Sequence, residues 1–163
     1  MAQESDIIVF DHGLHYPSWD ADKLINRTAT MLPAMATAKL VAWRETSLQH
    51  FNTSTGEFRH NKGLEKQGCH PIHTSPTPKL DAMMQAAKQA QWNVRFPDQA
   101  NFLYSPKPQT PNDLPELVVL PFYNYTHDLH YAHPDECTHY CSSPDLWLPI
   151  WRSLRVSMER LLL

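Results

Sequence analysis

The sequence predicts an α/β fold built around a parallel sheet, in a chain of 163 residues. Three short apolar runs have the length of buried strands, and segments with the apolar spacing of helices alternate with them. A hydrophobic fraction of 42% supplies the core of one ordinary globular domain. We therefore expect a single domain over residues 1–163, in which about three strands with flanking helices form part of a doubly wound sheet.

The N-terminal part predicts two strands and one helix. Residues 6–10 (DIIVF) are a continuous apolar run that stops at Asp-His-Gly, as a buried parallel strand does when it leads into a functional loop. A helix is expected from about Asp20 to a residue before Pro33. Residues 39–45 (KLVAWRE) predict the second strand. The buried face of the helix is expected to carry Leu24, Ile25, Thr28 and Leu32.

The remaining chain predicts a loop region, two helices and a third strand. Residues 46–78 are polar and proline-rich, which indicates a long loop region. Helical spacing is present over about 79–91, and residues 117–120 (LVVL) predict a third buried strand. A last helix is expected to begin its regular part at Pro149, because proline suits the first helical position. The expected core-facing residues are Leu80, Met83, Met84 and Ala87 in the first helix, and Trp147, Ile150, Trp151, Leu154, Met158, Leu161 and Leu162 in the second.

Charge and hydropathy exclude two classes of partner. The formal net charge is -3, and lysine and arginine are scattered along the chain, so no basic surface for nucleic acid is predicted. The apolar runs are far shorter than the roughly 20 residues that a membrane-spanning helix needs. We expect neither a nucleic-acid partner nor a membrane span in this chain.

The stretch 127–141 concentrates reactive side chains directly after the third predicted strand. It contains four of the ten histidines, three carboxylates and two of the three cysteines. Glu136 lies three residues before His139, a spacing that lets a carboxylate orient an imidazole as a general base. Asp135, four residues before His139, is the competing acid. In a parallel sheet, this stretch and the turn after residues 6–10 meet outside the carboxyl ends of the strands.

A zinc site is the rival interpretation of the same stretch. Cys137 and Cys141 have a spacing that is usual for zinc ligands. The second ligand pair that closes a structural site is not recognisable elsewhere, so we predict no metal. The candidate ligands of such a zinc site are His127, His130, His133, His139, Cys137 and Cys141.

Two features indicate a secretory lumen or the extracellular space. Asn26, Asn52 and Asn124 each begin an Asn-x-Ser/Thr triplet, which is the acceptor sequence for N-glycosylation. The cysteine count is odd, which in a lumenal protein implies a free thiol or a partner outside this sequence.

Three sequence blocks carry a resemblance to a known family. They are DIIVFDHGLHY from Asp6, WRETSLQHF from Trp43, and ECTHYC from Glu136 followed by PDLW from Pro144. In this order they resemble the PC-esterase and trichome-birefringence-like branch of the SGNH/GDSL hydrolases. The resemblance implies an O-acyl esterase or O-acetyltransferase of the Golgi or cell exterior. Such an enzyme acts on a glycan or polysaccharide, works through a Ser-His-Asp acyl-enzyme, and needs no cofactor.

The resemblance also assigns roles to single residues. His139 takes the place of the general base, and Glu136 stands where the family has aspartate. Asp11 stands where the family offers an asparagine amide to the oxyanion. A carboxylate cannot donate a hydrogen bond to the oxyanion, so His12 or the backbone amide of Gly13 would have to act as the donor in place of Asp11.

The family's nucleophile block is absent from this sequence. None of the four glycines is followed by Asp-Ser, and Ser47 is the nearest stand-in. We therefore expect the chain to be the C-terminal portion of an SGNH-like domain, inactive without an N-terminal portion that supplies strands and the serine. The resemblance further implies a disulfide between Cys69 and Cys137, and leaves Cys141 unpaired because its partner belongs to that N-terminal portion.

A third interpretation is a glycan-binding relic without catalytic activity. Aromatic side chains near the strand ends can stack on sugar rings, although such residues are more often part of the core. The candidates are Tyr16, Trp19, Trp43 and Tyr125.

Overall fold

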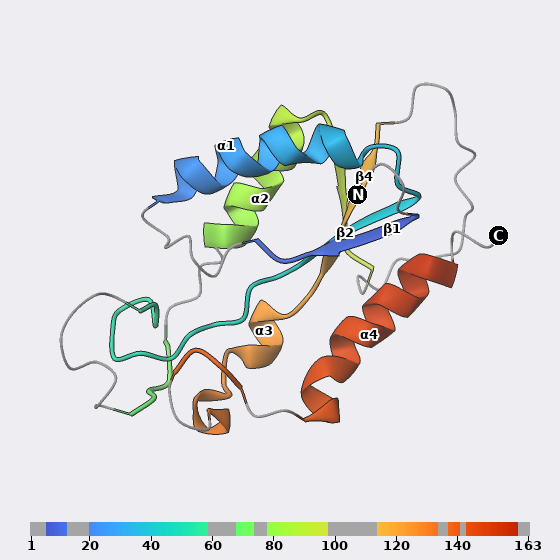
Figure 1. The fold of residues 1–163 in the computed structure, drawn as a ribbon. Helices are drawn as coiled ribbons and strands as arrows, with labels where there is room; N and C mark the ends of the chain where they lie inside the picture. Colours follow the sequence, from blue (N-terminus) through green and yellow to red (C-terminus); the bar gives the residue numbers. More distant parts are fainter. Residues whose placement is uncertain are drawn as a thin grey trace.

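The chain is an α/β fold with a four-stranded, all-parallel sheet flanked by helices (Figure 1). The computed structural model describes residues 6–12, 20–58, 68–73, 78–97, 114–133, 137–140 and 143–159. The predicted fold class and the parallel sheet are confirmed. The number of strands was underestimated by one.

The strands lie in the order β1-β2-β4-β3. Their bounds are Ile7–Phe10 for β1, Leu40–Arg44 for β2, Asn93–Arg95 for β3 and Glu116–Leu120 for β4. Ile7 pairs with Leu40 at one side of β2, and Val41 pairs with Leu117 at the other. Because all strands run the same way, the segments that follow β1, β2 and β4 leave the sheet at one edge.

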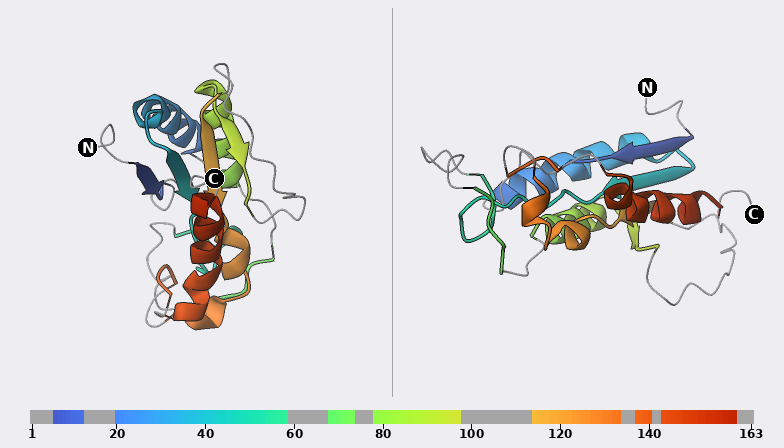
Figure 2. Two further views of the ribbon diagram at one scale, coloured as in Figure 1. Left: turned by 90° about the vertical axis from the view of Figure 1, so that its right-hand side faces the viewer. Right: turned by 90° about the horizontal axis from the view of Figure 1, so that it is seen from below.

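Helices cover both faces of the sheet (Figures 1 and 2). Helix α1 (Ala21–Met31) continues into a 3-10 turn, η3 (Leu32–Met35), and packs with α2 (Pro78–Gln89) on one face. Helix α4 (Pro144–Glu159) packs on the other face. The short helix α3 (Tyr123–Thr126) and the 3-10 turn η5 (His130–Ala132) follow β4.

The central strands β2 and β4 are buried on both faces. Along β2, Val41 and Trp43 pack in the cluster under α2 and η3, while Leu40 and Ala42 pack in the cluster under α4. This alternation follows from the two-residue period of a strand. Full burial of each large apolar side chain stabilises the fold by about 1.5–3 kcal/mol, so the two clusters anchor the sheet edge where the candidate site lies.

Strand β1 is a half-exposed edge strand, where a buried strand was predicted. Ile8 and Phe10 pack against the first cluster, but Ile7 and Val9 are 37% and 46% exposed. The physical reason is that α4 packs over β2 and β4 and leaves the same face of β1 uncovered.

The helices differ from their predicted form in two respects. Helix α4 begins at Pro144, so Pro149 lies inside it and is not its first residue. The helix buries a narrow stripe that includes Ile150 and Ser153, so three of the residues predicted to face the core are partly exposed. They are Trp147, Trp151 and Met158, with exposed fractions of 37%, 61% and 38%.

The same correction applies to one residue of α2. Met83 and Ala87 are buried as predicted, whereas Met84 is 43% exposed. Two residues of the predicted stripe in α4, Leu161 and Leu162, lie outside the described residues. Among the helices that the structure describes, none combines the length and apolarity needed to cross a bilayer.

Candidate functional site

The loop region predicted over residues 46–78 is largely buried in its first part, residues 46–51, and so is Glu45, which precedes it. Glu45 is only 5% exposed, and its Oε2 atom accepts hydrogen bonds from the backbone N–H groups of Phe122 and Tyr123, at 2.9 and 3.1 Å. Burial raises the pKa of Glu45, and the two backbone hydrogen bonds oppose that shift. The carboxylate thereby joins the end of β2 to the start of α3, just after β4.

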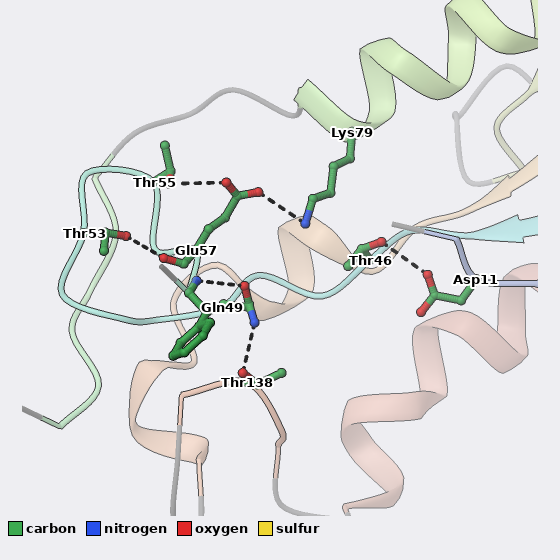
Figure 3. A network of polar contacts seen from close by, with 9 residues as sticks. Asp11, Thr46, Gln49, Thr53, Thr55, Glu57, Lys79 and Thr138 are labelled. Atoms are coloured by element: carbon green, nitrogen blue, oxygen red, sulfur yellow. Dashed lines mark hydrogen bonds and ion pairs between the residues drawn. The ribbon is translucent and has the colours of Figure 1, made fainter. Parts of the chain in front are cut away.

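Asp11 follows β1 and forms an ion pair with the guanidinium of Arg44. Thr46 Oγ1 donates a hydrogen bond of 3.2 Å to Asp11 Oδ1, which Figure 3 shows. The Arg44 guanidinium also lies 5.0 Å from the ring centroid of Phe122 and 5.9 Å from that of Trp147. Sequence reasoning missed Arg44, which places a cationic donor beside Asp11. The oxyanion role of Asp11 stays a prediction.

His12 is held against α1, because its Nδ1 atom lies 3.2 Å from Thr28 Oγ1. Partial burial lowers the pKa of His12, and the charge of Arg27 lowers it further. Gly13, the other oxyanion candidate, lies outside the described residues. Ser47 lies after β2, between Thr46, which contacts Asp11, and Leu48.

The disulfide between Cys69 and Cys137 is present, with Cα atoms 5.3 Å apart. It joins residues 68 positions apart in the sequence. Phe51 and Phe58 pack around it. The bridge fastens the chain before His139 to the segment that follows β2, as the family resemblance implied.

Backbone and side-chain hydrogen bonds reinforce this attachment. His50 N donates to Cys137 O at 2.9 Å. Gln49 Nε2 donates to Thr138 Oγ1 at 3.0 Å, as Figure 3 shows. Gln49 Oε1 in turn accepts from the backbone N–H of Phe58 at 3.1 Å. Residues 137–140, called here the histidine loop, are thus held against the segment 45–58, most of which is buried.

Tyr140 joins three segments through its hydroxyl. The hydroxyl donates a hydrogen bond to Leu48 O at 2.5 Å and lies 3.3 Å from Thr126 O. Thr126, fully buried, accepts a hydrogen bond from Leu48 N at 3.0 Å. Burial raises the pKa of Tyr140, so the phenol stays protonated and keeps this role.

A buried histidine that sequence reasoning missed, His50, is at the centre of the site. Its ring is fully buried, with Nε2 2.9 Å from His127 O and Nδ1 2.8 Å from His133 Nε2. Burial lowers the pKa of His50 to about 4, and the neighbouring His133, His130 and His127 add to that shift. At neutral pH, His50 is therefore uncharged.

The histidine loop presents His139 at the surface. Its side chain is exposed, and its backbone carbonyl accepts a hydrogen bond from His133 Nδ1 at 2.7 Å. The two candidate acids, Asp135 and Glu136, and the third cysteine, Cys141, lie outside the described residues. The predicted pairing of His139 with an acid stays a prediction.

The asparagines of the three glycosylation triplets are exposed. Asn26 lies on α1, Asn52 on the segment after β2, and Asn124 on α3. Trp43, by contrast, is 1% exposed in the core, so its predicted role in stacking on sugars is wrong. Tyr16 and Trp19 lie outside the described residues.

The alternative interpretation as a zinc site loses one of its candidate ligands, because Cys137 Sγ is bonded to Cys69 in the disulfide. Within the described ranges, no three His, Cys, Asp or Glu side chains are grouped so as to hold a metal ion. His127 Nδ1 instead lies 2.7 Å from Asp128 Oδ1, and His50 uses both of its ring nitrogens in contacts with protein atoms.

Comparison with known proteins adds no relative. The chain matches no protein-family model, no curated protein and no solved structure.

Proposed function

We propose that this chain is the C-terminal part of an SGNH-type O-acyl esterase or O-acetyltransferase that acts on glycans. The observation that carries the proposal is the attachment of the histidine loop. The Cys69–Cys137 bridge and the hydrogen bonds of Gln49 and His50 hold the exposed His139 at the carboxyl edge of a parallel sheet. In open α/β sheets, ligands bind outside this edge.

In the proposed reaction, His139 acts as the general base. It takes the proton of a serine hydroxyl while the serine oxygen attacks the acyl carbonyl, and the alcohol of the donor ester leaves with a proton. The acyl group then passes from the serine to water in an esterase, or to a sugar hydroxyl in a transferase. Glu136, or alternatively Asp135, orients the imidazole.

The serine is the missing part of this proposal. No Gly-Asp-Ser block occurs in the sequence, so the nucleophile and further strands are expected from an N-terminal portion of the same domain. Without it, a histidine and an acid can at most activate water, and turnover by this chain alone is expected to be negligible. A lumenal location accords with the disulfide and with the exposed asparagines of the three glycosylation triplets.

A second candidate is glycan binding without turnover. Tyr131 and Tyr125, in or next to the helical turns after β4, are 73% and 44% exposed. Exposed tyrosine rings can stack on sugars while their hydroxyls stay in water. A zinc-binding domain is the least favoured alternative, because one of its cysteines is in the disulfide.

The deciding experiment compares two forms of the protein. The protein encoded by the longest in-frame transcript and the present chain are expressed separately. Acetate release from an acetylated polysaccharide is measured with each protein. A longer product containing Gly-Asp-Ser is expected to turn over, and His139→Ala is expected to reduce its rate about 10²–10⁴-fold. An upstream stop codon, together with saturable glycan binding by the present chain, would favour the binding relic instead.

A further inference from the structure

We propose that His133 positions the loop that carries His139, and that it does so as a doubly protonated imidazolium held between His50 Nδ1 and the backbone carbonyl of His139. The contacts themselves are independent of any activity. Only the use made of His139 rests on the proposed function.

One chain of hydrogen-bonding contacts runs from the His127 carbonyl through the rings of His50 and His133 to the His139 carbonyl. His50 Nε2 faces the His127 carbonyl at 2.9 Å, and His133 Nδ1 faces the His139 carbonyl at 2.7 Å. A carbonyl only accepts, so each of these nitrogens must carry a hydrogen. Between the rings, His50 Nδ1 and His133 Nε2 are 2.8 Å apart, which is the length of a hydrogen bond. Two neutral imidazole rings carry two N–H hydrogens in total, whereas the three contacts need three.

The third hydrogen belongs to His133. Tyr140 Oη lies 3.2 Å from His50 Nδ1, but its single hydrogen is directed at Leu48 O at 2.5 Å. His50 is fully buried, and its pKa of about 4 makes it the acceptor of the pair. His133 is less deeply buried than His50 and carries the added proton, with both ring nitrogens donating.

The surroundings of the pair come from three segments. The segment after β2 contributes His50 itself. The stretch after β4 contributes His130 and His127, and His127 is paired with Asp128. The histidine loop contributes Tyr140, whose ring centroid is 4.3 Å from that of His133. Further protons on His127 or His130 would repel the imidazolium. Asp135 and Glu136 lie outside the described residues.

Loss of this proton has a defined structural consequence. With two hydrogens for three contacts, one contact must open, and the buried His50 keeps its bond to His127 O. His133 then releases either His50 or the His139 carbonyl. The Cys69–Cys137 bridge and the bond from His50 N to Cys137 O do not depend on this proton, so the loop stays attached while its His139 end loosens. The His139 end of the loop is therefore held in place at low pH and loosens as the pH rises.

The test is a titration of the imidazole nitrogens in the full chain, labelled with ¹⁵N-histidine, by long-range ¹H–¹⁵N correlation between about pH 5 and pH 9. His133 is expected to show two protonated nitrogens at the acidic end and to lose one proton as the pH rises. His50 is expected to keep its proton on Nε2 throughout. The His139 backbone amide shift is expected to change in step with His133.

Two variants separate positioning from a merely structural role. His133→Gln removes the titrating group and is expected to abolish the pH step at the His139 amide. His73→Gln, a matched change at an exposed histidine, is expected to leave the step in place. If His133→Gln does not fold, the wild-type titration alone still decides. A singly protonated His133 at every pH at which the chain is folded would overturn the inference. An observed proton without acyl turnover by the longer product would leave the inference standing and remove the proposed function.

Discussion

Lys79, in the first turn of α2, lies with its Nζ atom 3.3 Å from Glu57 Oε1, and the two side chains are only 14% and 9% exposed. Figure 3 shows the pair together with Thr55, whose hydroxyl is 3.5 Å from Glu57 Oε2. Burial lowers the pKa of Lys79, and the carboxylate of Glu57 opposes that shift. The ion pair therefore fastens α2 to the end of the segment that supports the histidine loop.

Removing the cation should be costly because the Glu57 carboxylate would remain in a nearly buried place. We expect Lys79→Met to lower the free energy of unfolding by about 3 kcal/mol, measured by urea denaturation. Replacing both partners, as Lys79→Met with Glu57→Gln, should recover most of that loss. Lys88→Met, at an exposed position of the same helix, should change stability by less than about 0.5 kcal/mol. Equal losses in the single and double variants would contradict the role given to the pair.

The turn after α2 contains a residue in an unfavourable backbone conformation. Gln91 has a φ angle of 60°, and the following residue, Trp92, donates its N–H to Ala87 O at 2.8 Å. This is the helix-ending position that glycine usually occupies. We expect Gln91→Gly to raise the free energy of unfolding by about 0.5–1 kcal/mol, because it relieves the left-handed strain. Gln89→Gly, within the helix, should lower it by about the same amount. A loss of stability in both variants would show that the turn is not strained.

The sequence was sufficient to predict the central strands, because β2 and β4 are buried on both faces and form continuous apolar runs. Strand β3 was missed because it has only three residues. Its signal is the alternation of Trp92, Val94 and Phe96, all of which contact the first core cluster. In α4, Pro149 cannot donate a hydrogen bond to the carbonyl of Asp145 one turn earlier, but Asp145 is exposed in the first turn, and the helix still starts at Pro144.

The candidate site was predictable only as a region. Its location followed from the rule that functional loops lie at the carboxyl edge of a parallel sheet, and the disulfide followed from the family resemblance. The contact between His50 and His133 joins residues 83 positions apart, and that of Tyr140 with Leu48 joins residues 92 apart. No local period encodes such contacts. These contacts form between the segments that follow β2 and β4, and the two segments become neighbours only when the sheet has folded.

The Cys69–Cys137 bridge closes a sequence separation of 68 residues. The chain-entropy estimate for a closure of this length is about 4 kcal/mol. We therefore expect reduction, or Cys69→Ser, to lower the free energy of unfolding by about that amount. Intact mass measurement should show two added hydrogens on reduction. Cys141→Ser should keep the bridge, and an alkylated Cys69 in oxidised, unreduced protein would contradict it.

His50 makes the stability of the fold depend on pH with a definite sign. Its pKa is about 4 in the folded chain against an ordinary value of 6.5. Between these two values the unfolded chain binds a proton that folded His50 does not, so the free energy of unfolding falls as the pH drops from 6.5 toward 4. The pH-dependent contribution of His50 to the free energy of unfolding is about 3 kcal/mol. It is fully present above pH 6.5 and is lost as the pH falls toward 4.

The measurement is urea denaturation across this pH range in wild type, His50→Gln and His73→Gln. His50→Gln lowers stability at every pH because it removes contacts to His127 O and His133, but it should flatten the acid-side slope, since glutamine does not titrate. His73→Gln, a change at an exposed histidine, should keep the wild-type slope because it leaves His50 and its contacts in place. Parallel curves for wild type and His50→Gln would show that His50 does not stay neutral in the folded chain. The proton attributed to His133 would then need another acceptor.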